Sequence, residues 1–240
     1  MPGNYRSIIA ERLHRAGWDL RRWPGLDEPA YRRCTLLSAN GVDLVVDVGA
    51  NVGQYSSGLR EHGYDGLIVS LEPTQAAFAQ LAALAAKDDR WTALRTAAGA
   101  EKGNVTINLA ANSVSSSVLR MLDRHAVAAP DSLYTGTEMA PIDRLDSLVG
   151  SWVADAVRPF LKIDVQGFER PVLEGSSTIL GRFVGVELEL CLVPLYEDQV
   201  LWREHIDYME SAGFKLVSMT PAFWDDASGE LLAADGIFLQ

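Results

Sequence analysis

The 240-residue sequence predicts an α/β fold, with one doubly wound, mostly parallel sheet of seven strands. Three observations predict it: short β-branched segments alternate with helical ones, the first such segment is apolar along most of its length, and a glycine-rich turn follows it directly. A strand that is apolar on both faces is typical of a parallel sheet covered by helices on both sides.

The N-terminal residues differ from the rest of the chain. Residues 1–40 combine partly helical spacing of apolar residues with arginine-rich stretches. We interpret residues 1–40 as an N-terminal helical cap and residues 41–240 as the sheet domain. The sequence contains no apolar run of about 18 residues and no hydrophobic leader, so we expect a cytoplasmic protein without an integral membrane segment.

Strands and helices alternate through the first half of the domain. The segment DLVVDV is short and β-branched, the segment GLIVSL repeats that character, and an alanine-rich helical segment follows the second. A Ser- and Thr-rich stretch at 110–140, which contains Pro130, is predicted as an irregular, substrate-facing insertion. The expected elements are strand 43–48, helix 55–62, strand 66–71, helix 75–86, strand 91–97 and a short exposed strand at 104–109.

The second half continues the same alternation. Pro171 falls in the first turn of a helix, where its missing N–H does no harm, and Gly213 ends a later helix. The expected elements are strand 158–165, helix 170–180, strand 184–190, helix 198–212, and two final strands, 214–219 and 236–239, around a turn at 225–229.

The overall charge restricts the partners. With 21 Lys and Arg against 32 Asp and Glu, the formal net charge is −11, which repels the phosphates of nucleic acid. We therefore expect a small-molecule or oligosaccharide acceptor and no nucleic acid. The other partner that we consider is a second copy of the chain, in a homodimer. The two cysteines, Cys34 and Cys191, form no CxxC motif, which disfavours zinc and disulfide scaffolds.

A glycine-rich loop and a later acid predict a nucleoside site. Residues 47–56 read DVGANVGQYS, in which Gly49 and Gly53 allow the turn between strand and helix to be tight. Glu72 lies nineteen residues beyond Gly53, at the end of the second strand, where a carboxylate accepts the hydroxyls of a ribose. The structural alternative is a plain strand-to-helix turn with a solvated Glu72.

Charge favours one nucleoside over another. The loop has the spacing G-x-x-x-G instead of the G-x-G-x-x-G that places backbone N–H groups on a pyrophosphate, and Asp47 before it repels a diphosphate. S-adenosylmethionine carries an ammonium and a sulfonium and no phosphate, so acids near the loop attract it. The loop therefore favours S-adenosylmethionine over NAD.

Several sequence blocks, in order, resemble the FkbM family of S-adenosylmethionine-dependent O-methyltransferases. The blocks are DVGANVGQYS at 47–56, LEP at 71–73, NSVSSS at 112–117, LKIDVQGFE at 161–169, VLEG at 172–175 and VELEL at 186–190. The resemblance implies a class I methyltransferase sheet, which is Rossmann-like, and methyl transfer to a hydroxyl, often of a sugar in a glycolipid, polysaccharide or antibiotic. The cofactor-binding residues expected are Asp47, Gly49, Asn51, Gly53, Gln54, Tyr55, Ser56, Glu72, Pro73, Ser116 and Asp164.

Acids at two strand ends are the first candidates for acceptor chemistry. Asp164 ends the fourth strand of the sheet, and Glu187 and Glu189 point to one side of the fifth, where an acid pair is expensive unless it is paired or metal-bound. We predict that Asp164 and Glu187, with Asp143 as a third candidate, bind the acceptor hydroxyls or hold a Mg²⁺ that lowers a hydroxyl pKa. The structural alternative is an ion pair with Lys162 or Arg182.

Histidines are the other candidate bases. His205 lies on the helix after the fifth strand and His125 lies in the irregular insertion. Asn112 and the serines at 115–117 are candidates for contact with cofactor or sugar. Three other functions stay open: a methyltransferase of another small-molecule hydroxyl, an NAD-type oxidoreductase and a binding module without catalysis.

Overall fold

The computed structural model describes residues 12–17 and 28–240, and it confirms the predicted fold class. The main sheet has seven strands in the order β3-β2-β1-β7-β8-β10-β9. All neighbours from β3 to β8 pair parallel, and β10 pairs antiparallel with both β8 and β9. The strands are β1 (Leu44–Val48), β2 (Leu67–Leu71), β3 (Trp91–Leu94), β7 (Pro159–Ile163), β8 (Gly185–Cys191), β9 (Lys215–Asp225) and β10 (Glu230–Leu239).

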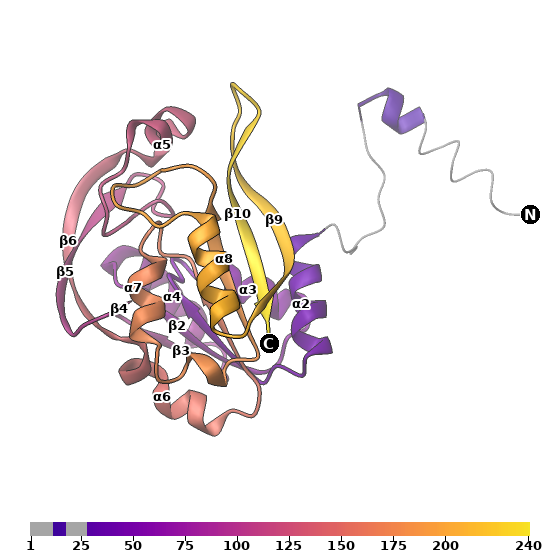
Figure 1. Cartoon of the computed structure of the whole chain (residues 1–240), viewed down its shortest axis with the longest axis vertical. Helices are drawn as coiled ribbons and strands as arrows, with labels where there is room; N and C mark the ends of the chain where they lie inside the picture. The colour runs from indigo at the N-terminus through magenta and orange to yellow at the C-terminus, as the bar shows by residue number, and fades with distance from the viewer. Residues whose placement is uncertain (1–11, 18–27) are drawn as a thin grey trace, which may run out of the picture.

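Helices cover both faces of this sheet (Figure 1). Alternate residues of β1 point to opposite faces: Val46 and Val48 pack with residues of α6, α7 and α8, whereas Val45 packs with residues of α2, α3 and α4. All five residues of β1 and of β7 are buried, as expected for the centre of a parallel sheet. The helices are α2 (Pro29–Ala39), α3 (Gln54–Glu61), α4 (Gln75–Ala85), α6 (Leu145–Asp155), α7 (Glu169–Gly175) and α8 (Trp202–Ser211).

The strand order reverses between β1 and β7. From β1 the chain extends the sheet first through β2 and β3, and only later through β7 and β8 on the other side. In an open α/β sheet the two connections then leave a crevice at the carboxyl ends of the central strands, which is where ligands bind. The topology therefore places a candidate site beyond Val48 and Ile163.

The interpretation of residues 110–140 as an irregular insertion is wrong in part. This stretch contains α5 (Asp123–Ala128) and most of β6 (Tyr134–Arg144), which forms a second, three-stranded sheet with β4 (Ala97–Gly99) and β5 (Gly103–Ala110) in the order β4-β6-β5. Figure 1 shows β5 and β6 along the left flank of the molecule. Most of β6 is exposed or half-buried, so its polar composition hides it from a search for apolar alternation.

Other boundaries differ from the predictions. The strand predicted at 91–97 is two strands of different sheets, because β3 ends at Leu94 and β4 begins at Ala97. The final strands are far longer than predicted and form the hairpin β9–β10. The helix predicted to reach residue 180 ends at Gly175, and α6 was not predicted.

The described part of the N-terminal cap packs as an integral layer of the domain. Cys34 and Leu37 of α2 are buried in one cluster with Leu59 of α3 and Val45 of β1. The rest of the predicted cap, at 1–11 and 18–27, lies outside the described residues. No helix in the described ranges is long and apolar enough to cross a membrane.

Candidate active site

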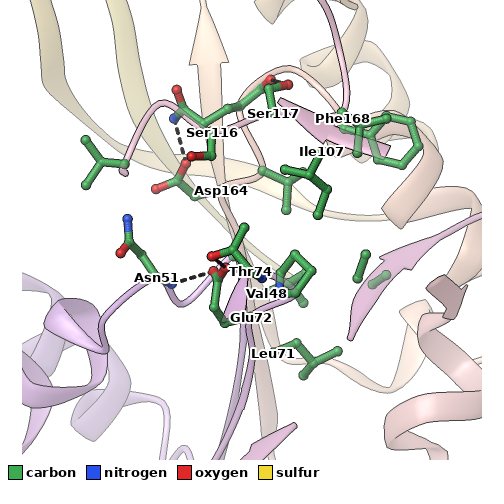
Figure 2. A pocket seen from close by; sticks show the side chains of 18 of the residues that line it. Val48, Asn51, Leu71, Glu72, Thr74, Ile107, Ser116, Ser117, Asp164 and Phe168 are labelled. Carbon is green, nitrogen blue, oxygen red and sulfur yellow. Dashed lines mark hydrogen bonds between the residues drawn. The ribbon is translucent and has the colours of Figure 1, made fainter. Parts of the chain in front are cut away.

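A cavity opens at the carboxyl ends of β1, β2 and β7 and has a volume of about 600 Å³ including its mouth. Figure 2 shows Glu72 and Thr74 facing Asp164 and Ser116 across it, with Asn51 at one side. The predicted cofactor residues that line it are Gly49, Asn51, Glu72, Pro73, Ser116 and Asp164.

Gly49 lets the loop after β1 approach the end of β7. It has φ +77°, and a Cβ there would lie 1.8 Å from the carbonyl oxygen of Asp164. Its N–H donates to the carbonyl of Leu71 at 3.0 Å, as does that of Ala50. The loop is therefore pinned between β2 and β7, and only glycine fits at this position. Gly53, which precedes α3 at φ +91°, faces Leu81 and Trp91 and does not line the cavity.

Glu72 is fixed by backbone donors. Its Oε2 accepts a hydrogen bond from the backbone N–H of Asn51 at 2.9 Å, and its Oε1 accepts from the backbone N–H of Thr74 at 2.8 Å and from the Thr74 hydroxyl. Burial raises the pKa of Glu72, and the donors on Thr74 and Asn51 oppose that shift. Oε2 accepts one hydrogen bond from the protein and has capacity for another.

Three non-glycine residues around the cavity have left-handed backbones. Asn51, Ser113 and Gln166 have φ of 47°, 58° and 56°, and all three line the cavity. Asn51 and Ser113 also bond to each other through their side chains, with Nδ2 to Oγ at 3.2 Å. Such conformations cost about 1–3 kcal/mol each and cluster at ligand sites, which supports a binding role for this cavity.

Asp47 lies behind the cavity, not in its wall. Its side chain is 0 % exposed; it accepts a hydrogen bond from Ser56 at 2.9 Å and forms an ion pair with Lys162 at 3.1 Å. Burial lowers the pKa of Lys162, but Asp47 and Asp164 more than offset this, so its pKa lies above the usual value. The Lys162 ammonium also donates to the carbonyl of Gly49 at 3.0 Å. Asp47 and Ser56 thus support the loop from behind.

Glu187 is paired with a residue of the N-terminal helix. Arg33 of α2 donates from Nε to both Glu187 carboxylate oxygens at 2.7 and 2.8 Å, and the Tyr55 hydroxyl donates to Oε2 at 2.8 Å. The Arg33 guanidinium also lies 4.6 Å from the Tyr55 ring centre. Glu187 and Tyr55 line only a small cavity behind the main one. Glu187 does form an ion pair, but with Arg33 instead of Lys162 or Arg182.

A second cavity, of about 840 Å³ including open space, adjoins the first. The two share Gly49, Asn51, Val114, Asp164 and Gln166. Gln54, another predicted cofactor residue, lines this second cavity only, as do Asn112 and Ser115. Its wall also includes Leu195, Phe223, His125 and Glu189.

Some of the candidate bases line a cavity and others do not. Asp164 lines both cavities and its side chain is 40 % exposed. His125 lines the second cavity, where burial lowers its pKa to about 4. His205 is buried on the inner side of α8 and lines neither cavity, and its ring nitrogens have no hydrogen-bond partner. Asp143 pairs with Lys102 at 3.3 Å, on the second sheet.

The described residues do not form the predicted metal site. Among them, no group of three or more His, Cys, Asp or Glu side chains could hold a metal ion. The carboxylate of Glu187 is already bonded to Arg33 and Tyr55. The small cavity that it shares with Asp164 is also lined by Arg33 and Lys162, whose positive charges oppose the binding of a cation. The structure offers no support for Mg²⁺ at these two residues.

Two residues of the second cavity were missed by the site prediction. Glu189 shares its side of β8 with Glu187, and the spacing alone does not say which of them faces a ligand. Gln166, in the sequence DVQG, contacts Asp164 and Glu189 through its side-chain amide at 3.0 and 3.1 Å. The sequence signal for Glu189 was the pair of glutamates on one side of the strand. Because Glu187 is paired with Arg33, Glu189 is the one that lines the second cavity.

Comparison with known proteins was made at three levels. The family model described as methyltransferase FkbM domain matches residues 47–216. Among curated proteins none matches the sequence. Solved structures that match include magnesium protoporphyrin IX methyltransferase from Synechocystis PCC 6803 with bound S-adenosylmethionine (12 % identity, 98 % of this chain and 96 % of that chain, TM-score 0.46). Another is 1,6-didemethyltoxoflavin-N1-methyltransferase from Burkholderia thailandensis (13 % identity, 100 % and 90 %, TM-score 0.46).

The family match spans more than half of the chain and includes the glycine loop, Glu72, Asp164 and both glutamates of β8. It confirms the resemblance carried by the sequence blocks, and the strand order agrees with the class I methyltransferase sheet that the resemblance implied. The chain belongs to the FkbM family of methyltransferases.

Proposed function

We propose that this protein is an S-adenosylmethionine-dependent O-methyltransferase that methylates a hydroxyl of a sugar or glycoside. The observation that carries the proposal is the meeting of two cavities at Asp164. The lining of one fits a cationic nucleoside, and the other has polar and aromatic side chains of the kind that bind carbohydrates.

The donor set of the first cavity fits S-adenosylmethionine. Among the residues that the structure describes, its lining contains the carboxylates of Glu72 and Asp164, two amides and several hydroxyls, and no Lys, Arg or His side chain. A phosphate-bearing cofactor needs positive or N–H-rich surroundings, whereas an ammonium and a sulfonium are stabilised by acids. Glu72 is placed to accept a ribose hydroxyl, and the cofactor supplies the methyl group when bound. An NAD-type oxidoreductase is correspondingly disfavoured.

The second cavity supports a saccharide acceptor. Carboxylate and amide groups of Asp164, Glu189 and Gln166 lie on one side, and Phe223 and His125 contact each other with ring centres 5.1 Å apart. Hydroxyl-rich rings bind through such groups, with their C–H faces on aromatic rings. The low pKa of His125 leaves its ring neutral at pH 7, so the wall presents no fixed positive charge to an acceptor.

Ligand-induced stabilisation tests the cofactor. S-adenosylhomocysteine at 100 times its Kd should add about 2.7 kcal/mol to the free energy of unfolding, or roughly 5–10 °C in Tm, whereas NAD and NADP should add nothing. A shift with NAD and none with S-adenosylhomocysteine would contradict the proposal.

A radiolabelled methyl-transfer assay tests the acceptor. Monosaccharides, oligosaccharides and glycolipids are compared with phenols, amines and thiols, and the product bond is identified by mass spectrometry. Transfer to a sugar oxygen supports the proposal. Transfer only to phenols supports the alternative of another small-molecule hydroxyl, and cofactor binding without transfer to any acceptor supports a binding module.

A further inference from the structure

We propose that Glu189 is the general base that accepts the proton of the acceptor hydroxyl, and that Gln166 holds it in place. This inference rests on the proposed O-methyl transfer. Glu189 lies near the carboxyl end of β8 and lines the second cavity beside Asp164, where the two cavities meet.

A chain of hydrogen bonds fixes the position of Glu189. Gln166 Nε2 donates to Glu189 Oε2 at 3.1 Å and to Asp164 Oδ1 at 3.0 Å, and Gln166 Oε1 accepts a hydrogen bond from the Tyr196 hydroxyl at 2.7 Å. Tyr196 is almost fully buried. Both amide hydrogens of Gln166 are therefore used, and rotating the amide would set its oxygen against two carboxylates. The two acids are held on either side of one amide group.

Glu189 and Asp164 differ in their charged neighbours. Asp164 lies 3.7 Å from the Lys162 ammonium, which stabilises its anion. Glu189 forms no ion pair with any described residue, and its Oε2 accepts one amide hydrogen bond. A carboxylate without a cation beside it holds a proton more tightly, so Glu189 is better suited to take one.

The surroundings act in the same direction. Burial raises the pKa of Glu189 well above its usual value, and the carboxylates of Asp164, Glu169 and Asp235 raise it further. A raised pKa makes a carboxylate a stronger base. The titratable and charged groups around Glu189 are Lys162 of β7, Asp164 just after β7, Glu169 of α7, Glu187 and Cys191 of β8, Asp235 of β10, Arg33 of α2, Tyr55 of α3, His125 of α5, and Tyr196.

The step balances without a metal or a further reactant. The acceptor O–H bond breaks and its proton goes to the Glu189 carboxylate, while the oxygen lone pair forms a bond to the methyl carbon. The carbon–sulfur bond breaks and its electron pair stays on sulfur, which becomes a neutral thioether. One positive and one negative charge disappear together, and the protonated Glu189 then returns its proton to solvent through the open side of the second cavity.

Glu189→Gln is the decisive variant, because it keeps the shape and the hydrogen-bond acceptor but removes the base. We expect kcat to fall at least 100-fold, while KM and the Kd for S-adenosylhomocysteine change less than about threefold. The acidic limb of the wild-type pH profile for kcat should disappear. Glu189→Asp, which keeps a carboxylate, should retain that limb with a smaller loss. Glu197→Gln, at an exposed carboxylate outside both cavities, is the matched control and should behave as wild type.

The outcomes separate this inference from the proposed function. If the wild type methylates a sugar, Glu189→Gln is as active as the wild type and Asp164→Asn is inactive, then Glu189 is not the base but the proposed function stands. If the wild type methylates a phenol hydroxyl and Glu189→Gln is inactive, Glu189 is the base but the acceptor class is wrong. If the wild type methylates only amines or thiols, or nothing, both are overturned. Should Glu189→Gln not melt cooperatively, Glu189→Asp decides through its acidic limb.

Discussion

At the scale of single residues, the site depends on positions where a different amino acid would clash with its neighbours. Gly49 is the clearest of these, because the loop that lines both cavities touches the end of β7 through it. A Cβ added at Gly49 would meet the backbone carbonyl of Asp164, which cannot move aside as the end of a flexible side chain could.

Gly49→Ala should therefore lower the free energy of unfolding by more than the cost of placing alanine in a left-handed backbone conformation. Gly63 also has a left-handed backbone, at φ +89°, but a Cβ there meets nothing within 4 Å. We expect Gly63→Ala to cost about 1–2 kcal/mol and Gly49→Ala about 3–5 kcal/mol, with loss of S-adenosylhomocysteine binding only in the latter. Denaturant unfolding and calorimetry measure both. Equal destabilisation by the two variants would show that the close approach to Asp164 is unimportant.

At the scale of elements, a largely buried ion pair connects α2 to β8. Arg33 and Glu187 are 154 positions apart in the sequence, with side chains 14 % and 4 % exposed. Tyr55, from the glycine-loop motif, donates to the same carboxylate. One cluster thus connects α2, α3 just after the glycine-rich loop, and β8.

Removing one partner of this cluster should leave the other buried and unpaired. Arg33→Ala leaves Glu187 as a buried charge without its cation, and we expect a loss of about 3–5 kcal/mol in the free energy of unfolding. Arg120→Ala, which breaks an exposed pair with Glu197, is the control and should cost less than about 1 kcal/mol. The double variant Arg33→Met, Glu187→Gln should recover part of the loss. If Arg33→Ala costs no more than Arg120→Ala, the pair does not anchor α2.

At the scale of the whole molecule, a net charge of −11 includes several carboxylates buried together. Burial raises the pKa of Glu169 to about 7, partly opposed by backbone donors, and burial also raises that of Asp235 to about 7. A raised folded-state pKa means that the folded protein binds the proton more tightly than the unfolded chain. Its contribution to stability is complete below the unfolded pKa and is lost as pH rises through the folded one.

We therefore expect the contribution of Glu169 to the free energy of unfolding, at most about 3 kcal/mol, to be lost between about pH 4.5 and pH 7. His125 and His205, whose pKa burial lowers to about 4, act in the opposite direction over this range, so the test compares a variant with the wild type. Glu169→Gln keeps an acceptor for the N–H groups of Val165 and Gly167 but has no proton to lose. Its free energy of unfolding should therefore rise relative to that of the wild type across this range, and the variant should be the more stable protein at pH 8. Glu101→Gln, on an exposed turn, is the control. Urea unfolding across this range gives the slope, and an unchanged slope in Glu169→Gln would refute the assignment.

Local patterns in the sequence were sufficient for the central fold and for several residues that line the first cavity. The apolar run before Gly49, the second strand ending at Glu72 and the fourth strand ending at Asp164 each carry their own signal, because buried strands and glycine turns are written in consecutive residues. Parallel strands then bring their carboxyl ends to one edge whatever lies between them. This is why Gly49, Glu72 and Asp164 were expected at one cavity and are found there.

Only the tertiary structure decided which acids are free. Asp47 and Glu187 look as available in the sequence as Glu189, but Lys162 neutralises the first and Arg33 the second, the latter from 154 positions away. The half-exposed strand β6 and the reach of the hairpin β9–β10 were likewise set by pairing between distant segments. A pattern in consecutive residues records burial and turn geometry, whereas the partner of a charge depends on where the rest of the chain brings its opposite.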